Sequence, residues 1–231
     1  MRSTRLQKIT FITGTDTGVG KTLVAASLLY HLRKTGENAL AMKPFSAGDR
    51  KDVEIFQTLQ QSAHVRIEEV NPFHFPDPVS PYAAQRTGGK KITLAQVLDR
   101  IQNVQHRCSH LVIEGLGGVM APLGEGFTVV DLIGQLCCEI IVVAQNSLGT
   151  INHTLLTVRA LQSCQRNAMT VVLMEKRRGD ASSSTNLPIL RELLAPICIR
   201  KWPFLGAKPK SMRAIKLNYR KTKKVLVQIL G

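Results

Sequence analysis

The part of the sequence that most constrains the fold is a glycine-rich turn between an apolar run and a helix-like stretch. The turn, GTDTGVGKT at residues 14–22, follows the run Lys8–Thr13 and leads into the stretch Thr22–Lys34. Glycines let successive backbone N–H groups face one anion, and the positive end of the helix dipole adds attraction. This order predicts a phosphate-binding loop, with Lys21 for the β/γ-phosphates and Thr22 for Mg²⁺.

The turn departs from the strict pattern GxxxxGK[ST] at one position. That pattern needs glycine at Thr15, whereas the sequence has its glycine one residue earlier, at Gly14. The alternative is a structural glycine turn with an incidental Lys-Thr pair. We prefer the phosphate loop because the strand and the helix flank it in the required order.

Short apolar runs alternate with helix-like stretches along the chain, and the runs are continuous, as in strands covered on both faces. This alternation predicts an α/β fold, a P-loop NTPase-like three-layer arrangement with a mainly parallel central sheet. A length of 231 residues suits one well-buried domain, so we expect a single domain over residues 1–231. The expected strands are Lys8–Thr13, Ala39–Met42, Leu111–Glu114, Ile140–Ala144, Thr170–Met174 and Ile197–Ile199, and the expected helices are Thr22–Lys34, Asp52–Ser62, Leu94–Arg107, Ile151–Gln165 and Leu187–Leu194.

Two segments do not fit this alternation. Asn71–Pro81 contains four prolines, so it is expected to be neither a regular helix nor a central strand. A long apolar loop in a compact domain usually serves a function. Arg177–Thr185, with the sequence RRGDASSST, is expected to be an exposed polar loop.

The net charge of +15, from 31 Lys and Arg against 16 Asp and Glu, is unevenly spread. No acidic residue follows Glu192, and ten basic residues do. Aromatic residues make up 5% of the chain and are not interleaved with basic ones, so we expect no nucleic-acid partner. In the basic segment at about 206–231, apolar residues recur at helical spacing. We expect a terminal helix packed on its own domain with a solvated basic face, and no membrane partner.

The five cysteines form no CxxC pair and no zinc-type spacing with histidine. Scattered cysteines in apolar segments are typical of free thiols in a reducing compartment, and no apolar run approaches the roughly 18 residues that span a bilayer. We therefore expect a cytoplasmic protein. The cysteines are Cys108, Cys137, Cys138, Cys164 and Cys198.

Charged residues stand where two of the expected strands end. Glu114 closes Leu111–Glu114, and Lys43 directly follows Ala39–Met42. Carboxyl ends of parallel strands meet at one edge of a sheet, where ligand sites form. A carboxylate at the end of an apolar strand is poorly explained by packing, whereas Lys43 has the alternative of a surface lysine. Asp52, taken alone, fits a helix-start acid stabilised by the dipole.

These segments together resemble dethiobiotin synthetase, an ATP-dependent enzyme family of biotin synthesis. The resemblance covers about Ile9–Thr157 and consists of several motifs in order. They are GTDTGVGKT (14–22), Lys43-Pro44 with Gly48 and then Asp52, the proline-rich VNPFHFPDPVSPYAA (70–84), Glu114-Gly115-Leu116-Gly117-Gly118, Phe127-Thr128 with Asp131, and LGTINH (148–153).

The resemblance implies a cytoplasmic, homodimeric ligase that binds ATP and Mg²⁺. Its substrates would be 7,8-diaminopelargonate and CO₂ or bicarbonate. One amine forms a carbamate, ATP phosphorylates the carbamate, and the second amine closes the cyclic urea of dethiobiotin. Such phosphoryl transfer needs alignment and charge neutralisation more than covalent help from the protein.

The resemblance also implies roles for individual residues. Lys43, Lys21 and Thr17 would be catalytic, and Thr22, Asp52 and Glu114 would hold Mg²⁺. Nucleotide contacts would come from Gly18, Val19, Gly20, Lys21, Thr22, Leu23, Asp52, Glu114, Gly115, Leu116, Gly117, Glu175, Pro203, Phe204 and Leu205. Substrate contacts would come from Thr17, Lys43, Ser46 and Ala47, and from Gly149, Thr150, Ile151 and Asn152 of the neighbouring subunit, which would receive the tail carboxylate. Without the resemblance, the last group reads as an ordinary capped helix start.

Three positions depart from the family pattern. Gly18 stands where many members have glutamate, and Ala47 replaces the usual Ser or Thr, with Ser46 one position early. Met174 stands where many members have an asparagine that reads adenine, and a thioether cannot make that pairing. Base contacts are then expected from Glu175 or from the backbone near 203–205.

Two other functions are weighed against this one. A partitioning or cell-division P-loop ATPase could use the basic C-terminal segment as a membrane-binding amphipathic helix. Its loop carries an additional lysine where this chain has Asp16. A cobyrinate-amidating type of ligase would need a glutamine-hydrolysing domain, for which 231 residues leave no room.

Overall fold

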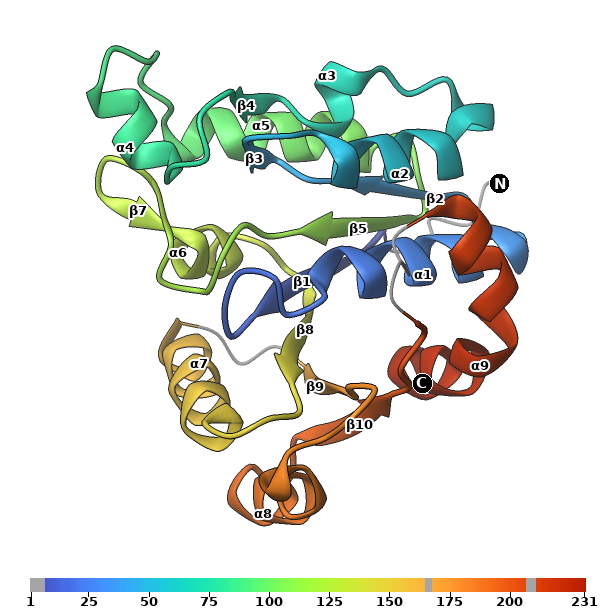
Figure 1. Cartoon of the computed structure of the whole chain (residues 1–231). Coiled ribbons are helices and arrows are strands. Elements are labelled where there is room, and N and C mark those ends of the chain that lie inside the picture. Colours follow the sequence, from blue (N-terminus) through green and yellow to red (C-terminus); the bar gives the residue numbers. More distant parts are fainter. Residues whose placement is uncertain (1–6, 165–167, 207–210) are drawn as a thin grey trace.

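The computed structural model describes residues 7–164, 168–206 and 211–231, with a central parallel sheet between helical layers (Figure 1). The sheet has six strands in the order β10-β9-β8-β1-β5-β2, and every neighbouring pair is parallel. All six expected strands are confirmed, with ends shifted by a few residues. Their bounds are β1 (Lys8–Gly14), β2 (Ala39–Met42), β5 (His110–Glu114), β8 (Glu139–Gln145), β9 (Met169–Met174) and β10 (Cys198–Trp202).

The strands match their sequence runs because both faces of the sheet are covered. Every residue of β2 and β5 is buried, as are six of the seven in β1. Phe11 and Ile12 of β1 are at most 1% exposed. A continuous apolar run satisfies both faces, whereas an alternating run would place polar residues in one helical layer.

The five expected helices are confirmed, again with small shifts at their ends. The predicted Asp52–Ser62 ends early, because α2 stops at Leu59 and a short 3₁₀ turn follows at Gln61–Ala63. The predicted last residue of Ile151–Gln165, Gln165, lies outside the described residues. The helices are α1 (Lys21–Lys34), α2 (Lys51–Leu59), α5 (Leu94–Gln105), α7 (Thr150–Cys164) and α8 (Asn186–Leu193).

Short elements that were not predicted fill the connections. They are β3 (Phe45–Ala47), β4 (Phe73–Phe75), β6 (Pro122–Gly124), β7 (Phe127–Thr128), α3 (Ile67–Val70), α4 (Pro81–Arg86) and α6 (Val129–Gly134). The proline-rich Asn71–Pro81 stays outside the central sheet, as predicted. Its strand β4 pairs with β3 in a separate two-stranded sheet. Arg177–Thr185 contains a single 3₁₀ turn, Ala181–Ser184, and is largely exposed.

The direction of the connections decides which helix covers which face. Across the sheet, the chain first moves from β1 toward the edge strand β2. It then moves back from β2 through β5, β8 and β9 to the opposite edge strand, β10. Right-handed crossovers therefore place α1 on one face and α5, α7 and α8 on the opposite face. The C-terminal helix α9 (Met212–Leu230) packs beside α1 (Figure 1).

The packing of α9 confirms the expectation of a terminal helix packed on its own domain. Ile215, Val225 and Leu226 are at most 6% exposed, whereas the Lys and Arg side chains of this helix are exposed. Residues 207–210, part of the basic segment, lie outside the described residues. No helix in the described part of the chain is both long and apolar enough to cross a membrane.

Candidate active site

The carboxyl edge of the sheet gathers the loops that the sequence singled out. The glycine-rich loop follows β1, Lys43 follows β2, and Glu114 is the last residue of β5. On the other side of β1, Gln145 ends β8 and Glu175 follows β9. Because β1 is the strand at which the direction of the chain reverses, the loops on its two sides diverge and leave room for a ligand there.

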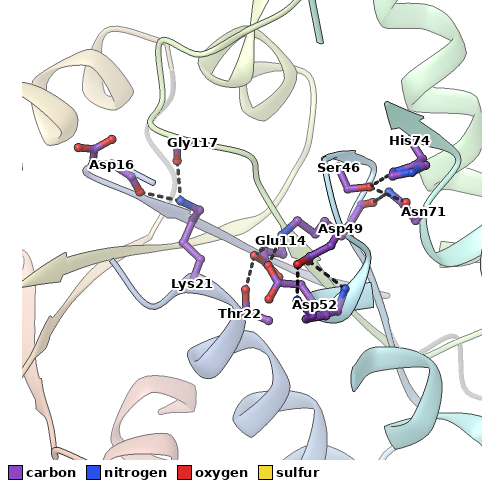
Figure 2. Close-up of polar contacts among 12 residues, drawn as sticks. Asp16, Lys21, Thr22, Ser46, Asp49, Asp52, Asn71, His74, Glu114 and Gly117 are labelled. Atoms are coloured by element: carbon purple, nitrogen blue, oxygen red, sulfur yellow. Dashed lines mark hydrogen bonds and ion pairs between the residues drawn. The ribbon is translucent and has the colours of Figure 1, made fainter. Parts of the chain in front are cut away.

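The glycine-rich loop holds the ammonium of Lys21 close to backbone oxygens. Lys21 is 7% exposed, and its Nζ donates to the carbonyl oxygens of Asp16 at 2.7 Å and Gly117 at 2.8 Å (Figure 2). Gly20 has φ +113°, and a Cβ there would also lie 2.9 Å from the Met174 side chain. Both facts explain glycine at this position.

Burial lowers the pKa of Lys21 to about 8, from an ordinary value of 10.5. The carboxylate of Glu114 acts in the opposite direction, and the nearby Lys43 ammonium lowers the pKa further. A cation held away from water and short of counter-charge would gain from a phosphate. The local electrostatics therefore suit an anion at this loop.

Glu114 is the centre of the polar cluster beside the loop. It is 1% exposed, and its Oε1 accepts from the Thr22 hydroxyl at 2.8 Å and from Lys43 Nζ at 3.0 Å (Figure 2). Lys43 Nζ also donates to Asp52 Oδ2 at 2.7 Å. The structure thus brings together the three predicted metal ligands and the predicted catalytic lysine, from four separate segments of the chain.

The two carboxylates keep Lys43 charged. Burial alone would lower its pKa, but Glu114 and Asp52, by charge and by hydrogen bonding, outweigh burial and raise the pKa above its ordinary value. Lys43 is 7% exposed, so it is a buried cation rather than the surface lysine of the alternative interpretation. A permanently charged ammonium is suited to neutralise a developing negative charge.

The same cluster fits a hard cation. Glu114 Oε2 is buried and has no hydrogen-bond partner among the described residues. An unpaired buried carboxylate oxygen is costly unless something binds it. The Thr22 hydroxyl and the carboxylates of Asp52 and Glu114 are oxygen groups of the kind that hard cations bind.

A cavity of about 250 Å³ opens on the other side of the loop, between the ends of β9 and β10. It brings together eight of the predicted nucleotide-binding residues. Met174, which is 9% exposed, forms part of its wall. The predicted residues at this cavity are Gly18, Val19, Gly20, Leu23, Glu175, Pro203, Phe204 and Leu205.

The carboxylate of Glu175 is already engaged beside this cavity. Its Oε1 accepts from Asn146 Nδ2 at 3.2 Å and from Lys201 Nζ at 3.1 Å. Asn146 is 1% exposed and also donates to the carbonyl of Ser183 at 3.0 Å. Glu175 is thereby held at the cavity wall by residues of β10 and of the loop after β8.

The proline-rich segment closes over the Lys43 side of the site. Ser46 is 3% exposed; its hydroxyl donates to Asn71 Oδ1 at 2.7 Å and lies 3.0 Å from His74 Nδ1 (Figure 2). Asn71 Nδ2 donates to the carbonyl of Lys43 at 2.7 Å. Ser46 is therefore part of an internal network, and Ala47 beside it is half-buried. Their substrate contacts stay predictions.

A second cavity, of about 340 Å³, lies where the glycine-rich loop faces the start of α7. Thr17 and Thr150 both line it. Thr150 is 5% exposed, Ile151 is half-buried and Asn152 is exposed. Of the four residues predicted to receive the tail carboxylate, only Thr150 lines this cavity, and the expected contribution from a second subunit stays a prediction.

Sequence reasoning missed two polar residues at the end of β8. Gln145 Nε2 donates to the carbonyl of Gly18 at 3.3 Å, and Asn146 anchors Glu175 as described. Lys176 and Arg177 also line the smaller cavity and were not predicted. A signal was present, because Gln145 and Asn146 end an apolar run with polar side chains, as Glu114 does in β5.

Comparisons with known proteins agree with this arrangement. Residues 8–199 match a family model described as an AAA domain. The ATP-dependent dethiobiotin synthetase of Bacillus velezensis is 32% identical over 205 residues, which is 87% of this chain and 85% of that protein. The corresponding protein of Endomicrobium trichonymphae is 36% identical, over 79% of this chain and 87% of its own. The chain belongs to the dethiobiotin synthetase family.

The fold is also shared with proteins that are distant in sequence. The crystal structure of a ParA family ATPase from Chlorobium tepidum aligns with a TM-score of 0.56 and 13% identity, over 97% of this chain and 98% of that one. At such an identity the likeness concerns the fold alone. Together with the matched AAA domain model, it confirms the predicted P-loop NTPase-like α/β fold class.

Proposed function

We propose that this chain is an ATP-dependent dethiobiotin synthetase, which forms the cyclic urea of dethiobiotin from 7,8-diaminopelargonate and CO₂. Family membership supports the reaction. The observation that carries the proposal is the cluster of Lys43, Glu114, Asp52 and Thr22 beside the glycine-rich loop. It combines a buried cation with two carboxylates next to a phosphate-binding turn, as transfer of a phosphoryl group to a carbamate requires.

The reaction places different demands on the two lysines. Carbamate formation converts one amine of the substrate into an anion, which Lys43 would bind and orient through its permanent charge. Lys21 would turn from the carbonyls of Asp16 and Gly117 to the phosphates of ATP, and Thr17 would bind from the same loop. Both cations then face negative charge that builds up during phosphoryl transfer, which is the main contribution a protein makes to that step.

Mg²⁺ would be held by Thr22, Asp52 and Glu114. The hydroxyl and the carboxylates are hard oxygen ligands, and Glu114 Oε2 has no other described partner. When bound, the ion supplies charge neutralisation on the phosphates. The residues Gly115, Leu116 and Gly117 follow Glu114 directly, so they would frame the same ligand.

The base of the nucleotide would occupy the cavity lined by Met174 and residues 203–205. Met174 and Leu23 offer apolar contact there, and Glu175 lies at the wall. Backbone groups near Pro203, Phe204 and Leu205 would supply the polar contacts to the base. We expect Gly18, Val19 and Gly20 to bind the phosphates through their N–H groups.

The substrate would extend from Lys43 toward the cavity lined by Thr17 and Thr150. Gly149, Thr150, Ile151 and Asn152 would receive the tail carboxylate at the start of α7 of a second subunit, so we propose a homodimer. The exposed Leu148 and Leu156, at 83% and 58%, lie on this side and would be covered by the partner.

We further propose that the chain is one domain and acts in the cytoplasm.

One assay tests the proposal. The protein is incubated with diaminopelargonate, bicarbonate, Mg²⁺ and a nucleotide, and dethiobiotin is detected by mass spectrometry. We expect product with wild type and a loss of orders of magnitude with Lys21→Ala. A matched control is Lys90→Ala, which removes an exposed lysine from the loop between α4 and α5. The absence of product with ATP, CTP and GTP alike would contradict the proposed activity.

The partitioning-type ATPase is not favoured as a second function. Asp16 stands where its loop would need a lysine. The apolar face of α9 is buried against α1 rather than free to insert into a bilayer.

A further inference from the structure

Helix α9 presents two faces of different character. Its buried face, with Ile215, Thr222 and Leu226 at 2%, 2% and 0% exposure, packs beside α1 (Figure 1). At 3.6 residues per turn, residues 213, 217, 220, 224 and 227 stand on the opposite side. We call this side with its flanks the outward face of α9; its exposed residues are Arg213, Lys216, Leu217, Arg220, Lys221, Lys223, Lys224, Val227 and Gln228.

The outward face of α9 carries positive charge that no acidic residue of the helix balances. It carries six Lys and Arg residues, and α9 contains no Asp or Glu. None of the ion pairs formed by described residues includes a side chain of α9. Lys34 of α1 adds a further cation beside the helix, 5.7 Å from the ring centre of Tyr219. A surface with this much unpaired charge is complementary to an anionic partner.

Two exposed apolar side chains on the outward face of α9 indicate which class of anionic partner this face can bind. Leu217 is 79% exposed and Val227 is 49% exposed, and both stand among the cations. A nucleic-acid backbone offers phosphates but nothing that gains from covering leucine, and no aromatic side chain is exposed on this face for stacking on bases. The headgroup region of a bilayer offers both phosphates and apolar depth.

We propose that the outward face of α9 docks on an anionic lipid bilayer, with the helix still packed on α1. The cations would bind lipid phosphates while Leu217 and Val227 enter the headgroup region. This departs from the sequence expectation of a merely solvated basic face. It also differs from an amphipathic-helix anchor, because the apolar face of α9 stays buried in the domain.

Helix α9 extends from the Leu205 side of the sheet, where Asn218 Nδ2 donates to the carbonyl of Leu205 at 3.5 Å, toward the opposite edge. Ile229 and Leu230 line a small cavity with Thr10, Glu139 and Thr170, near the starts of β1, β8 and β9. The end of α9 therefore lies at the amino edge of the sheet, opposite the carboxyl edge that holds the Lys43 cluster. Docking through the outward face of α9 would therefore use a different surface from the Lys43 cluster and from the two cavities at the carboxyl edge, which no residue of α9 lines.

The test is co-sedimentation of the full chain with vesicles of phosphatidylcholine and phosphatidylglycerol in a roughly 2:1 mixture. We expect binding to these vesicles and none to pure phosphatidylcholine, and a loss of binding when salt rises from about 0.1 M to about 0.5 M. The double variant Arg220→Glu/Lys224→Glu should lower the partition coefficient by more than about tenfold, because each reversed charge turns attraction into repulsion.

Two further variants test separately whether vesicle binding depends on where the charges lie and on the apolar side chain of Leu217. Lys90→Glu/Arg191→Glu makes the same change in net charge at exposed residues outside α9, and should bind as wild type does. Leu217→Ser leaves the charge unchanged and should weaken vesicle binding about fivefold, because the buried apolar area is lost. Circular dichroism and dethiobiotin formation check that every variant is folded.

Three results would overturn the proposal. They are equal binding to neutral and anionic vesicles, equal loss of binding in the two charge-reversal variants, and unchanged vesicle binding of Leu217→Ser. A duplex DNA fragment is included as a competitor. If it binds more tightly than the vesicles, and Leu217→Ser leaves its binding unchanged, the partner is a nucleic acid and the membrane assignment is wrong.

Discussion

Positive charges are handled in opposite ways at the carboxyl edge of the sheet and on the outward face of α9. At the edge, Lys43 lies within 3.0 Å of two carboxylates, and Lys21 donates to two carbonyl oxygens. On α9, six exposed cations have no ion-pair partner among the described residues. Burial makes an unpaired charge costly, so at the edge Lys43 is paired with carboxylates, while Lys21 is held by carbonyl oxygens and has a lowered pKa. Water tolerates unpaired charge on the surface, where it is available to an external partner.

The largest expected effect comes from removing the cation at the centre of the buried cluster. Lys43→Met keeps most of the side-chain volume but leaves Glu114 without its positive neighbour. We expect dethiobiotin formation to fall about a thousandfold or more, because the carbamate and the transferring phosphoryl group lose their counter-charge. Steady-state assays with purified protein measure the effect.

A stability measurement accompanies this variant. Breaking a buried pair commonly costs about 3–5 kcal/mol, so Lys43→Met should also unfold at lower denaturant concentration. Addition of Mg²⁺ should recover part of that stability if Glu114 is one of its ligands. A variant with near-normal turnover would refute the role of Lys43 in neutralising charge.

The two faces of α9 predict the next largest effect. Leu226→Ala on the buried face should destabilise the fold by about 2–5 kcal/mol, because it removes a fully buried side chain and leaves a cavity. Leu217→Ala is the matched control, with the same chemical change at a residue that is 79% exposed, and should alter stability by less than about 0.5 kcal/mol. Urea unfolding of both proteins distinguishes them; similar losses would mean that α9 is packed differently.

The lowered pKa of Lys21 predicts a pH dependence of about tenfold per unit. In the folded enzyme Lys21 loses its proton near a pH of about 8, below its ordinary pKa of 10.5. The free enzyme therefore loses the charge that binds phosphate as pH rises, and kcat/KM for ATP should fall about tenfold per pH unit above about 8. Lys43, whose pKa is raised, stays charged across the same range.

The lowered pKa of Lys21 has the opposite effect on the stability of the fold, which should rise with pH. Between a pH of about 8 and 10.5 the unfolded chain binds more protons at Lys21 than the folded one does, so this group makes unfolding less favourable as pH rises. Activity and stability should thus diverge over this range. A flat kcat/KM profile up to a pH of about 10 would show that Lys21 is not the titrating group.

The smallest expected effect is on activity when the outward face of α9 is altered. Arg220→Glu/Lys224→Glu should change kcat by less than about twofold, because neither side chain lines the two cavities at the carboxyl edge and exposed charges are screened by salt. The measurement is made without vesicles. A large loss would mean that charge on α9 reaches the active site, and would remove the contrast between the two regions.

Local signals in the sequence predicted the strands and most of the site. The runs of β1, β2, β5, β8 and β9 were recognisable because strands covered on both faces must be apolar throughout. Lys43 and Glu114 were recognisable because charged residues end such runs. The short β3, which follows Pro44, and β4, which lies between Pro72 and Pro76, were missed because three residues are too few to show a periodic pattern.

The sequence by itself determined that the chain is α/β, that residues 14–22 form a phosphate loop, and to which family its motifs point. It could not decide between a surface Lys43 and a buried one, between Asp52 as a helix-start acid alone and as a member of the Lys43 cluster, or how α9 faces its domain. Those answers depend on which segments meet in space. Parallel strand order brings residues 22, 43, 52 and 114 to one edge, and packing against α1 selects which side of α9 remains in water.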